Sequence, residues 1–275
     1  MFRTIKGMCM AAPAPWTRAA LLLLMLAGAP GLALGQDMMS GVDLSSPAFT
    51  QAGMTRAEVA AVLEAGSPVD LAGRRLNGLD LSELDFSGAN MRGAYLNKAK
   101  LANARFDGAI LDQVWALDSD WSGASLKGAS LFGAQMRGAT LAGVDLTGAR
   151  IAADLTRAKL AGARLVQADL SADMKNQSMG LMRAVLDSAD LTGADLSGAN
   201  LSRTRMKFAK MAGVNLSEAD LTLAELAGAD LTGATVAGAN FDRADVTSTK
   251  LVDLKKEGQA RNLEAARNLD RAVRN

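Results

Sequence analysis

Large apolar residues recur at every fifth position through residues 69–253. Typical units are FSGAN at 86–90, MRGAY at 91–95, LTGAD at 191–195 and LSGAN at 196–200. Each unit begins with a large apolar residue, called the centre below. Two small or polar residues follow the centre, then an alanine and a polar residue. The regularity predicts one repeating architecture for about two-thirds of the chain.

A five-residue period suits neither a straight helix nor a straight strand. Five residues advance about 500° around a helix, so the centres would cover every face. On a strand, an odd step turns the side chain to the opposite face each time. The pattern works if the chain turns a corner once per unit. The centre and the residue two before it then point inward, and the residue between them points outward.

The corners and the outward positions have their own composition. Glycine often stands two residues after the centre, as at Gly88 and Gly93, which favours a corner with positive φ. Outward positions are mostly Asp and Asn, which we interpret as a solvated surface. On that interpretation, replacing Asp195 with alanine changes the unfolding free energy by no more than about 0.5 kcal/mol.

These units resemble the pentapeptide-repeat family, whose motif reads roughly Ala-(Asp/Asn)-Leu-X-X. The resemblance implies an all-β solenoid: a right-handed quadrilateral β-helix with four units per coil. The period alone does not distinguish three sides from four. With four sides, residues 69–254 form ~9 coils and a rod of roughly 45 Å at strand spacing.

The flanking segments predict short helical caps at both ends of the solenoid. Residues 36–54 are polar and indicate a mobile linker. Thr55 and Glu58 have capping-box spacing, which predicts a helix near 55–65 inside an N-terminal cap at 55–68. After residue 254, apolar residues spaced for one helical face predict a C-terminal helical cap at 255–275. Some members of the family dimerise through a C-terminal element, so a homodimer through this helix is left open.

Residues 1–35 have the features of a cleavable secretory signal. Three positive charges accompany an apolar run at 19–34, and Ala33-Leu34-Gly35 is a small-x-small cleavage site. The run is short for a membrane span, which needs ~20 residues, although an uncleaved anchor is the alternative. We therefore expect a periplasmic or secreted protein with no stable membrane span after cleavage.

The residue types present exclude much chemistry. The chain has no histidine, and its one cysteine, Cys9, lies in the predicted signal. Without Cys and His there is no thiolate nucleophile, Ser-His relay or imidazole-bound metal. Asp118 and Asp120 alternate on one side, but no cleft is expected around a packed solenoid. We predict no enzyme activity, no catalytic residue, no cofactor and no metal site.

Methionines and acidic residues do not change that expectation. Met174, Met179 and Met182 are better explained as gap-fillers than as a Cu(I) site. The outward Asp and Asn residues are spread one per side and are not gathered into a calcium loop.

The net charge of the repeat region limits the kind of partner that it can bind. Residues 69–254 hold 20 basic and 22 acidic residues, counted from the printed sequence. Such a balance provides no electrostatic footprint for nucleic acid. The alternative function is regulation of a type II topoisomerase by mimicry of DNA, as in the quinolone-resistance members of the family. The near-neutral charge and the export signal disfavour it.

Three irregularities interrupt the repeat. The step from Ile151 to Leu155 is one residue short, and residues 171–180 match no unit, which predicts a bulge or projecting loop. Such loops often bind partners, although a tolerated insertion is the simpler explanation. Ala116 and Trp121 occupy consecutive centres and are expected to compensate in volume within one coil.

The candidate partner-binding surface is an exterior ladder of large side chains. Coils of 20 residues place Arg75, Tyr95, Trp115 and Gln135 one above another, with other large residues at nearby outward positions. The candidate binding residues are Tyr95, Trp115, Leu117 and Phe132. The alternative is a cross-coil stack that only stabilises the sheet face. The sequence thus predicts an exported, non-enzymatic interaction module for an unknown protein partner in the cell envelope.

The signal hypothesis predicts a defined mature terminus. Cleavage between Gly35 and Gln36 is expected, because the small-x-small site ends there. N-terminal sequencing of the protein recovered from the periplasmic fraction tests this. A chain that starts at Met1 in that fraction, or one retained in the membrane, contradicts it.

Overall fold

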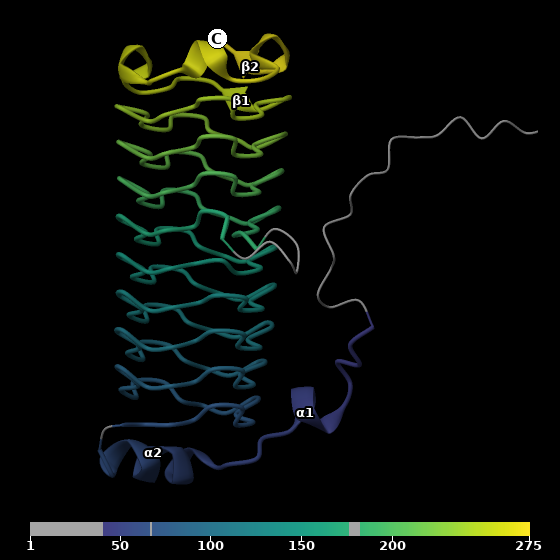
Figure 1. The fold of residues 1–275 in the computed structure, drawn as a ribbon, viewed down its shortest axis with the longest axis vertical. Coiled ribbons are helices and arrows are strands. Elements are labelled where there is room, and N and C mark those ends of the chain that lie inside the picture. The colour runs from purple at the N-terminus through teal and green to yellow at the C-terminus, as the bar shows by residue number, and fades with distance from the viewer. Residues whose placement is uncertain (1–40, 67, 176–181) are drawn as a thin grey trace, which may run out of the picture. The chain divides into compact units, whose positions relative to one another are not determined.

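The computed structural model of the chain describes residues 41–66, 68–175 and 182–275. The predicted signal, and the part of the predicted linker at 36–40, lie outside these residues. A one-turn helix, α1 (Pro47–Thr50), and the helix α2 (Arg56–Glu64) precede a stack of coils (Figure 1). None of the helices in the described part of the chain has the length and apolar character needed to span a bilayer.

Each coil has four sides, which confirms the quadrilateral arrangement. In the regular coils, parallel bridges join each outward residue to the one 20 positions later, as in Asp70 with Asn90 and Arg75 with Tyr95. Each side is so short that it contributes a single bridging residue. The backbone hydrogen bonds therefore run between coils: Leu71 N donates to Asn90 O at 2.8 Å, and Asn90 N donates to Val69 O at 2.9 Å.

The bridges define four ladders, one per side. The two ladders used below are named side B and side C. Side B consists of Arg75, Tyr95, Trp115, Gln135, Asp154, Val185, Arg205, Glu225, Asp245 and Arg267. Side C consists of Asp80, Lys100, Asp120, Thr140, Lys159, Asp190, Lys210, Asp230, Lys250 and Val273.

The core is formed by the centres and the small residues two before them, as predicted. Leu191 and Leu196 are fully buried, and Ala194 between them is 1% exposed. Alanine at these sites leaves room for the centres of adjacent sides to meet inside the coil. Large apolar centres stacked in this way bury area worth about 25 cal/mol per Å².

The irregular centres Ala116 and Trp121 pack together in the core. Trp121 is fully buried, and its Nε1 donates to Ser119 Oγ at 2.7 Å, while Ser119 Oγ donates to Ala116 O at 2.6 Å. The small centre at Ala116 and the large one at Trp121 lie in one coil, as expected. Ser119 replaces the usual alanine because the buried indole N–H needs an acceptor.

The corners explain the outward Asp and Asn residues, and they correct our interpretation of a merely solvated surface. Asp190 Oδ1 accepts hydrogen bonds from Thr192 N at 3.0 Å and from Thr192 Oγ1 at 2.7 Å. These bonds hold the pKa of Asp190 below its usual range. Asp195 likewise accepts from Ser197 N at 3.1 Å and from Asn215 Nδ2 at 3.0 Å. The outward carboxylate thus satisfies a corner N–H that no backbone group reaches.

The N-terminal helix forms where it was predicted. Thr55 Oγ1 accepts from Glu58 N at 3.2 Å, and Thr55 N donates to Glu58 Oε2 at 2.7 Å, so both bonds of the capping box are present. Val59 of α2 is fully buried and belongs to the same core as the coils. Val62 and Leu63 pack against that core, and α2 thereby covers apolar side chains of the first coil.

The prediction of a helical cap over residues 255–275 is wrong. This segment forms one more turn of the stack, with three single-turn 3-10 helices: η2 (Glu257–Gln259), η3 (Leu263–Ala265) and η4 (Leu269–Arg271). Strand β1 (Lys250–Leu251) pairs in parallel with β2 (Val273–Arg274). The corners of this turn take one extra residue each, because Asn240 pairs with Arg261 and Asp245 with Arg267. Apolar residues such as Leu263, Ala266 and Leu269 also fall on one face of an α-helix, which is why the sequence pattern predicted a helix here.

The two breaks in the period are absorbed without loss of the stack. Pairing shifts to 19 residues at Gln135 with Asp154, where Ala152 and Ala153 are buried in the short step. Asp154 then pairs with Val185, 31 residues later. The sequence predicted a bulge or projecting loop at 171–180, and residues 176–181 lie outside the described residues. Asp173 N donates to Met182 O at 2.7 Å at the base of this segment.

The inward and outward assignment predicts unequal costs for two neighbouring substitutions. Leu196→Arg places an unpaired charge in the core and is expected to cost several kcal/mol. Asp195→Ala removes two hydrogen bonds at the surface and is expected to cost about 1 kcal/mol, more than the sequence alone suggested. Urea denaturation of both variants measures the costs, and equal losses contradict the assignment.

Candidate functional site

The predicted ladder exists on side B. Arg75 bridges Tyr95, Tyr95 bridges Trp115, and Trp115 bridges Gln135. Its aromatic part does not face open solvent, however: Tyr95 and Trp115 are only partly exposed. The chain covers them with a segment of its own.

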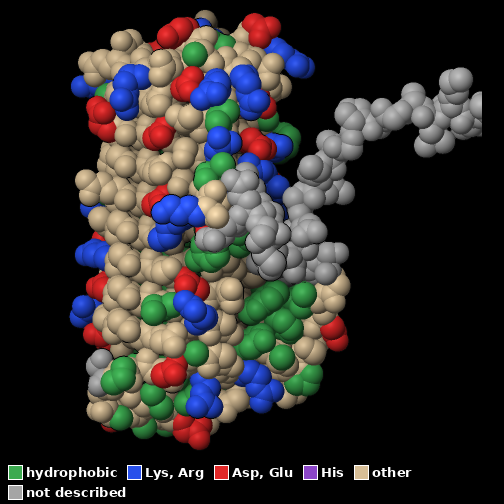
Figure 2. Space-filling view, in the orientation of Figure 1, with side chains coloured by type: hydrophobic (Ala, Val, Ile, Leu, Met, Phe, Trp, Pro, Cys, Tyr) green, Lys and Arg blue, Asp and Glu red, His purple; other side chains and the backbone are tan. Residues whose placement is uncertain are grey.

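That cover is formed by residues 41–54, called the strap below. We expected a mobile linker here, and the described part of it is instead docked on side B. The ring of Phe49 stands edge-on to Tyr95 with centroids 5.2 Å apart, and edge-on to Trp115 with centroids 4.8 Å apart. Gly53 N donates to Arg75 O at 2.7 Å and holds the end of the strap next to α2. Hydrophobic side chains are visible on the surface at the level of α1 (Figure 2).

Two asparagines at the same corner of consecutive coils hold the strap in place. Asn77 Nδ2 donates to Ala48 O at 2.9 Å and to Gln51 O at 3.0 Å, and Asn97 Nδ2 donates to Phe49 O at 3.1 Å. These carbonyls lie at the C-terminal end of α1, where helical carbonyls have no partner within the helix. Asn77 and Asn97 are 5% and 6% exposed, so their amides need these acceptors.

The other oxygen of each asparagine holds the coils together. Asn77 Oδ1 accepts from Asn97 N at 3.1 Å, and Asn97 Oδ1 accepts from Leu117 N at 2.9 Å. Each amide is therefore oriented by the coil above it. The stack itself aims the NH₂ groups at the strap.

The four predicted residues do not form one cluster. Leu117 and Phe49 line the same cavity, which has a volume of about 290 Å³. The other residues around it include Leu44, Lys98 and Asp118. Phe132 is partly exposed and follows Leu131 at a different corner of its coil, where Asp112 Oδ1 accepts from Phe132 N at 3.1 Å. The structure brings together Tyr95, Trp115 and Leu117, with Phe49 added.

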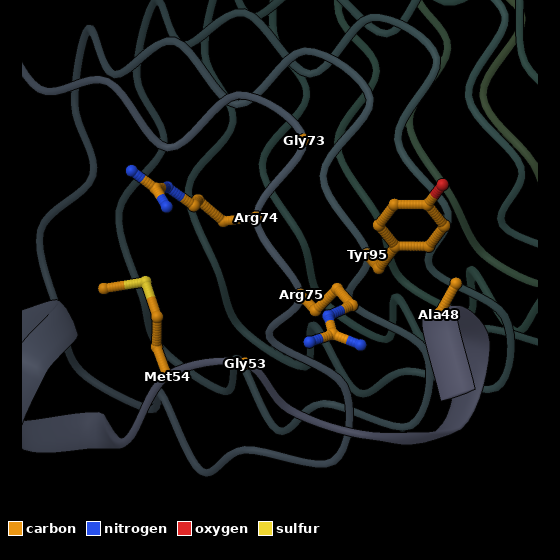
Figure 3. A pocket seen from close by; sticks show the side chains of 7 residues that line it. All are labelled: Ala48, Gly53, Met54, Gly73, Arg74, Arg75 and Tyr95. Carbon is orange, nitrogen blue, oxygen red and sulfur yellow. The ribbon is translucent and has the colours of Figure 1, made fainter.

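A second cavity, of about 350 Å³, lies beside the strap (Figure 3). Arg74, Arg75 and Tyr95 line it from the coils, and Met54 lines it from the strap. The two guanidinium groups point in different directions (Figure 3). Arg75 packs across Gly53, where a Cβ would meet its Nε at 3.3 Å. This cavity is thus a gap at the edge of the strap and not a convergent anion site.

The far part of side B is charged and paired. Arg183 Nη1 lies 2.7 Å from Glu225 Oε1, and Lys207 Nζ lies 2.9 Å from Glu225 Oε2. Burial opposes ionisation of Glu225, but the hydrogen bonds from Lys207 and Arg183 outweigh it and hold its pKa below the usual range. The group is an internal ion-pair network.

Two aromatic residues escaped the sequence reasoning. Phe49 was overlooked because it lies in a polar segment, although Pro47 and Phe49 together were a signal of a docked turn. Phe208 is 67% exposed at a corner with φ of 58°, where a bulky residue is uncommon. Its ring lies over Gly228, where a Cβ would come within 2.5 Å of Phe208 Cδ1. Phe208 is a single exposed apolar side chain with no second one beside it in the described residues.

The chain matches the family described as Pentapeptide repeats, in eight copies, over residues 70–113, 118–148, 152–172, 181–218 and 209–247. Among solved structures, it is similar to HetL, a pentapeptide repeat protein involved in heterocyst differentiation regulation from the cyanobacterium Nostoc. The identity is 27%, over 80% of this chain and 99% of HetL, with a TM-score of 0.35.

Two further solved structures resemble the chain. Rfr23 from the cyanobacterium Cyanothece 51142 is 32% identical over 39% of this chain and 63% of its own, with a TM-score of 0.28. QnrB1, a plasmid-mediated fluoroquinolone resistance protein, is 18% identical over 73% of this chain and 89% of its own, with a TM-score of 0.38. No curated protein sequence matches the chain.

The ring contacts predict energetic coupling between the strap and the ladder. Phe49→Ala and Trp115→Ala together should cost less than the sum of the single costs, by about 0.5–1.5 kcal/mol, because both remove the same ring pair. Unfolding free energies of the two single variants and the double variant measure the coupling. Phe208→Ala with Trp115→Ala is the control pair and should be additive. Additivity for Phe49 as well contradicts the docked strap.

Proposed function

Because the chain belongs to the pentapeptide-repeat family, we propose that it is a non-enzymatic interaction module that presents side B to a protein partner. The single observation that carries this proposal is the aromatic ladder of Tyr95 and Trp115. On the outward positions of a soluble coil stack, large aromatic side chains are out of place. Tyr and Trp are enriched where proteins bind each other.

The charge distribution supports a protein partner over mimicry of DNA. Along side C, acidic and basic residues largely alternate from coil to coil, and Lys250 Nζ lies 3.0 Å from Asp230 Oδ2. Lys210 also lowers the pKa of Asp190, after the hydrogen bonds from Thr192. A surface that mimics a duplex needs an unbroken negative potential, which alternating charges cancel.

Export to the periplasm or beyond is part of the proposal. It is supported by the composition of residues 1–35, with positive charges, an apolar run and a small-x-small site. The partner we propose is accordingly a protein of the cell envelope.

A homodimer through a C-terminal helix is not part of the proposal. In place of the helix that suggested it, the segment forms η2, η3 and η4. Its two buried side chains, Leu263 and Ala266, are each 8% exposed and belong to the core of the stack.

The proposal predicts that partner capture depends on the ladder. Mature protein with Tyr95→Ala and Trp115→Ala should retain less than about a tenth of the partner that the parent captures from a cell-envelope extract, because hot-spot aromatics contribute 2 kcal/mol or more. Phe208→Ala is the matched control, since it removes one exposed aromatic elsewhere. Deletion of residues 171–180 should matter less than the double substitution.

Mass spectrometry of the captured proteins measures the outcome, and circular dichroism checks that each variant is folded. Unchanged capture by the folded double variant overturns the assignment to side B. Loss of capture in the deletion variant alone would move the site to the projecting segment.

A further inference from the structure

We propose that the ladder of side B accepts the C-terminal turn of a partner helix that carries an aromatic side chain, in competition with the strap. This inference rests on the proposed function, because it names the kind of partner that side B binds. The strap, as its present occupant, shows the chemistry that the site recognises.

The first element of recognition is the pair of amide donors. Asn77 and Asn97 are oriented from behind by their bonds to the coils, so their NH₂ groups keep their direction whatever lies in front of them. They donate to Ala48 O, Gln51 O and Phe49 O at the end of α1. Several free carbonyls so close together occur where a helix ends. A strand presents alternate carbonyls to opposite edges, so it fits the donors less well.

The second element is the aromatic slot. Tyr95 and Trp115 lie on consecutive coils and both receive the ring of Phe49 edge-on, at 5.2 and 4.8 Å between centroids. Edge-to-face contacts with two rings favour an aromatic side chain over an aliphatic one of similar size. The occupant must therefore present an aromatic residue beside its last helical carbonyls, as Phe49 is placed in α1.

The strap satisfies both elements only weakly. Helix α1 has four residues, its N-cap Ser46 makes no capping bond, and none of its residues is buried. One helical turn has little stability of its own. The cavity of about 290 Å³ beside Phe49 and Leu117 also remains unfilled, with Lys98 and Asp118 at its edge. A longer partner helix can fill it and bury more apolar area.

The strap competes because it is tethered. Gly53 N to Arg75 O and the helix α2 hold its C-terminal end next to the ladder. A tethered occupant has a high effective concentration, so it lowers the apparent affinity for any free competitor. Loosening the strap should thus increase binding without any new contact to the partner.

A peptide copy of the strap tests this in the full-length protein. The probe is residues 43–52 of this chain, acetylated, amidated and labelled with fluorescein. Its affinity for Phe49→Ala protein should exceed that for the parent by at least tenfold, as measured by fluorescence anisotropy. The same peptide with alanine at the Phe49 position should not bind. Equal affinity for the two proteins, or no binding to Phe49→Ala protein at millimolar peptide, overturns the proposal.

Asn97→Asp separates recognition from folding. The aspartate keeps an oxygen for Leu117 N but loses the donor to Phe49 O, so the coils should stay intact while the strap loosens. Acrylamide quenching of Trp115 fluorescence should rise in this variant, and Trp115→Phe supplies the background from the other tryptophans. Quenching unchanged from the parent in a folded Asn97→Asp protein contradicts the role of the amide.

The outcomes distinguish this inference from the proposed function. If the peptide binds but ladder variants still capture the envelope partner, the chemistry of the site holds and its assignment as the partner surface fails. If capture depends on the ladder but the peptide does not bind, side B is the partner surface and the proposal that it binds the end of a helix is wrong.

Discussion

The structure depends on the hydrogen bonds that run from coil to coil. Each side of a coil is too short to pair with anything except the sides above and below it, so every outward residue bridges one residue in the next coil. This requirement forces a corner once per unit, with a left-handed residue in it, as at Gly193 with φ of 66°. It also leaves a corner N–H that needs a side-chain oxygen, which Asp190 and Asp195 supply. The composition of the repeat follows from this geometry.

The same geometry explains how far the sequence could be interpreted. The core positions follow from the period, because a position five residues on always has the same environment. The four sides, and with them the ladder on side B, followed only from the family resemblance. The capping box at Thr55 is equally local and was predictable. The tail was not, because a six-residue spacing with Leu263 and Leu269 fits both a helix face and a coil with longer corners. Pairing with the preceding coil decides between a helix and a coil with longer corners, and the local sequence pattern carries no information about that pairing.

The strap was missed for a different reason. Its own residues bury little, and its position is determined by Asn77 and Asn97, which look like ordinary corner residues in the sequence. Only the structure shows that each asparagine uses its oxygen within the stack and its nitrogen outside it. The strap packs on the ladder of side B, where Phe49 contacts Tyr95 and Trp115. Side B is therefore the side of the coils on which a described non-repeat segment docks.

The longer corners of the last turn determine how the stack ends. The exposed edge of a β-solenoid can act as a template on which the coil of another molecule is deposited. Here, however, the terminal edge advances six residues per side, from Arg261 to Arg267 to Val273. The bridging residues of this turn stay in register with the regular coil next to it, because the extra residue of each side lies in a corner, where η2, η3 and η4 form. The last turn therefore presents wider corners than a regular coil does, so the corners of a coil from another molecule would find no equivalent corners to stack on.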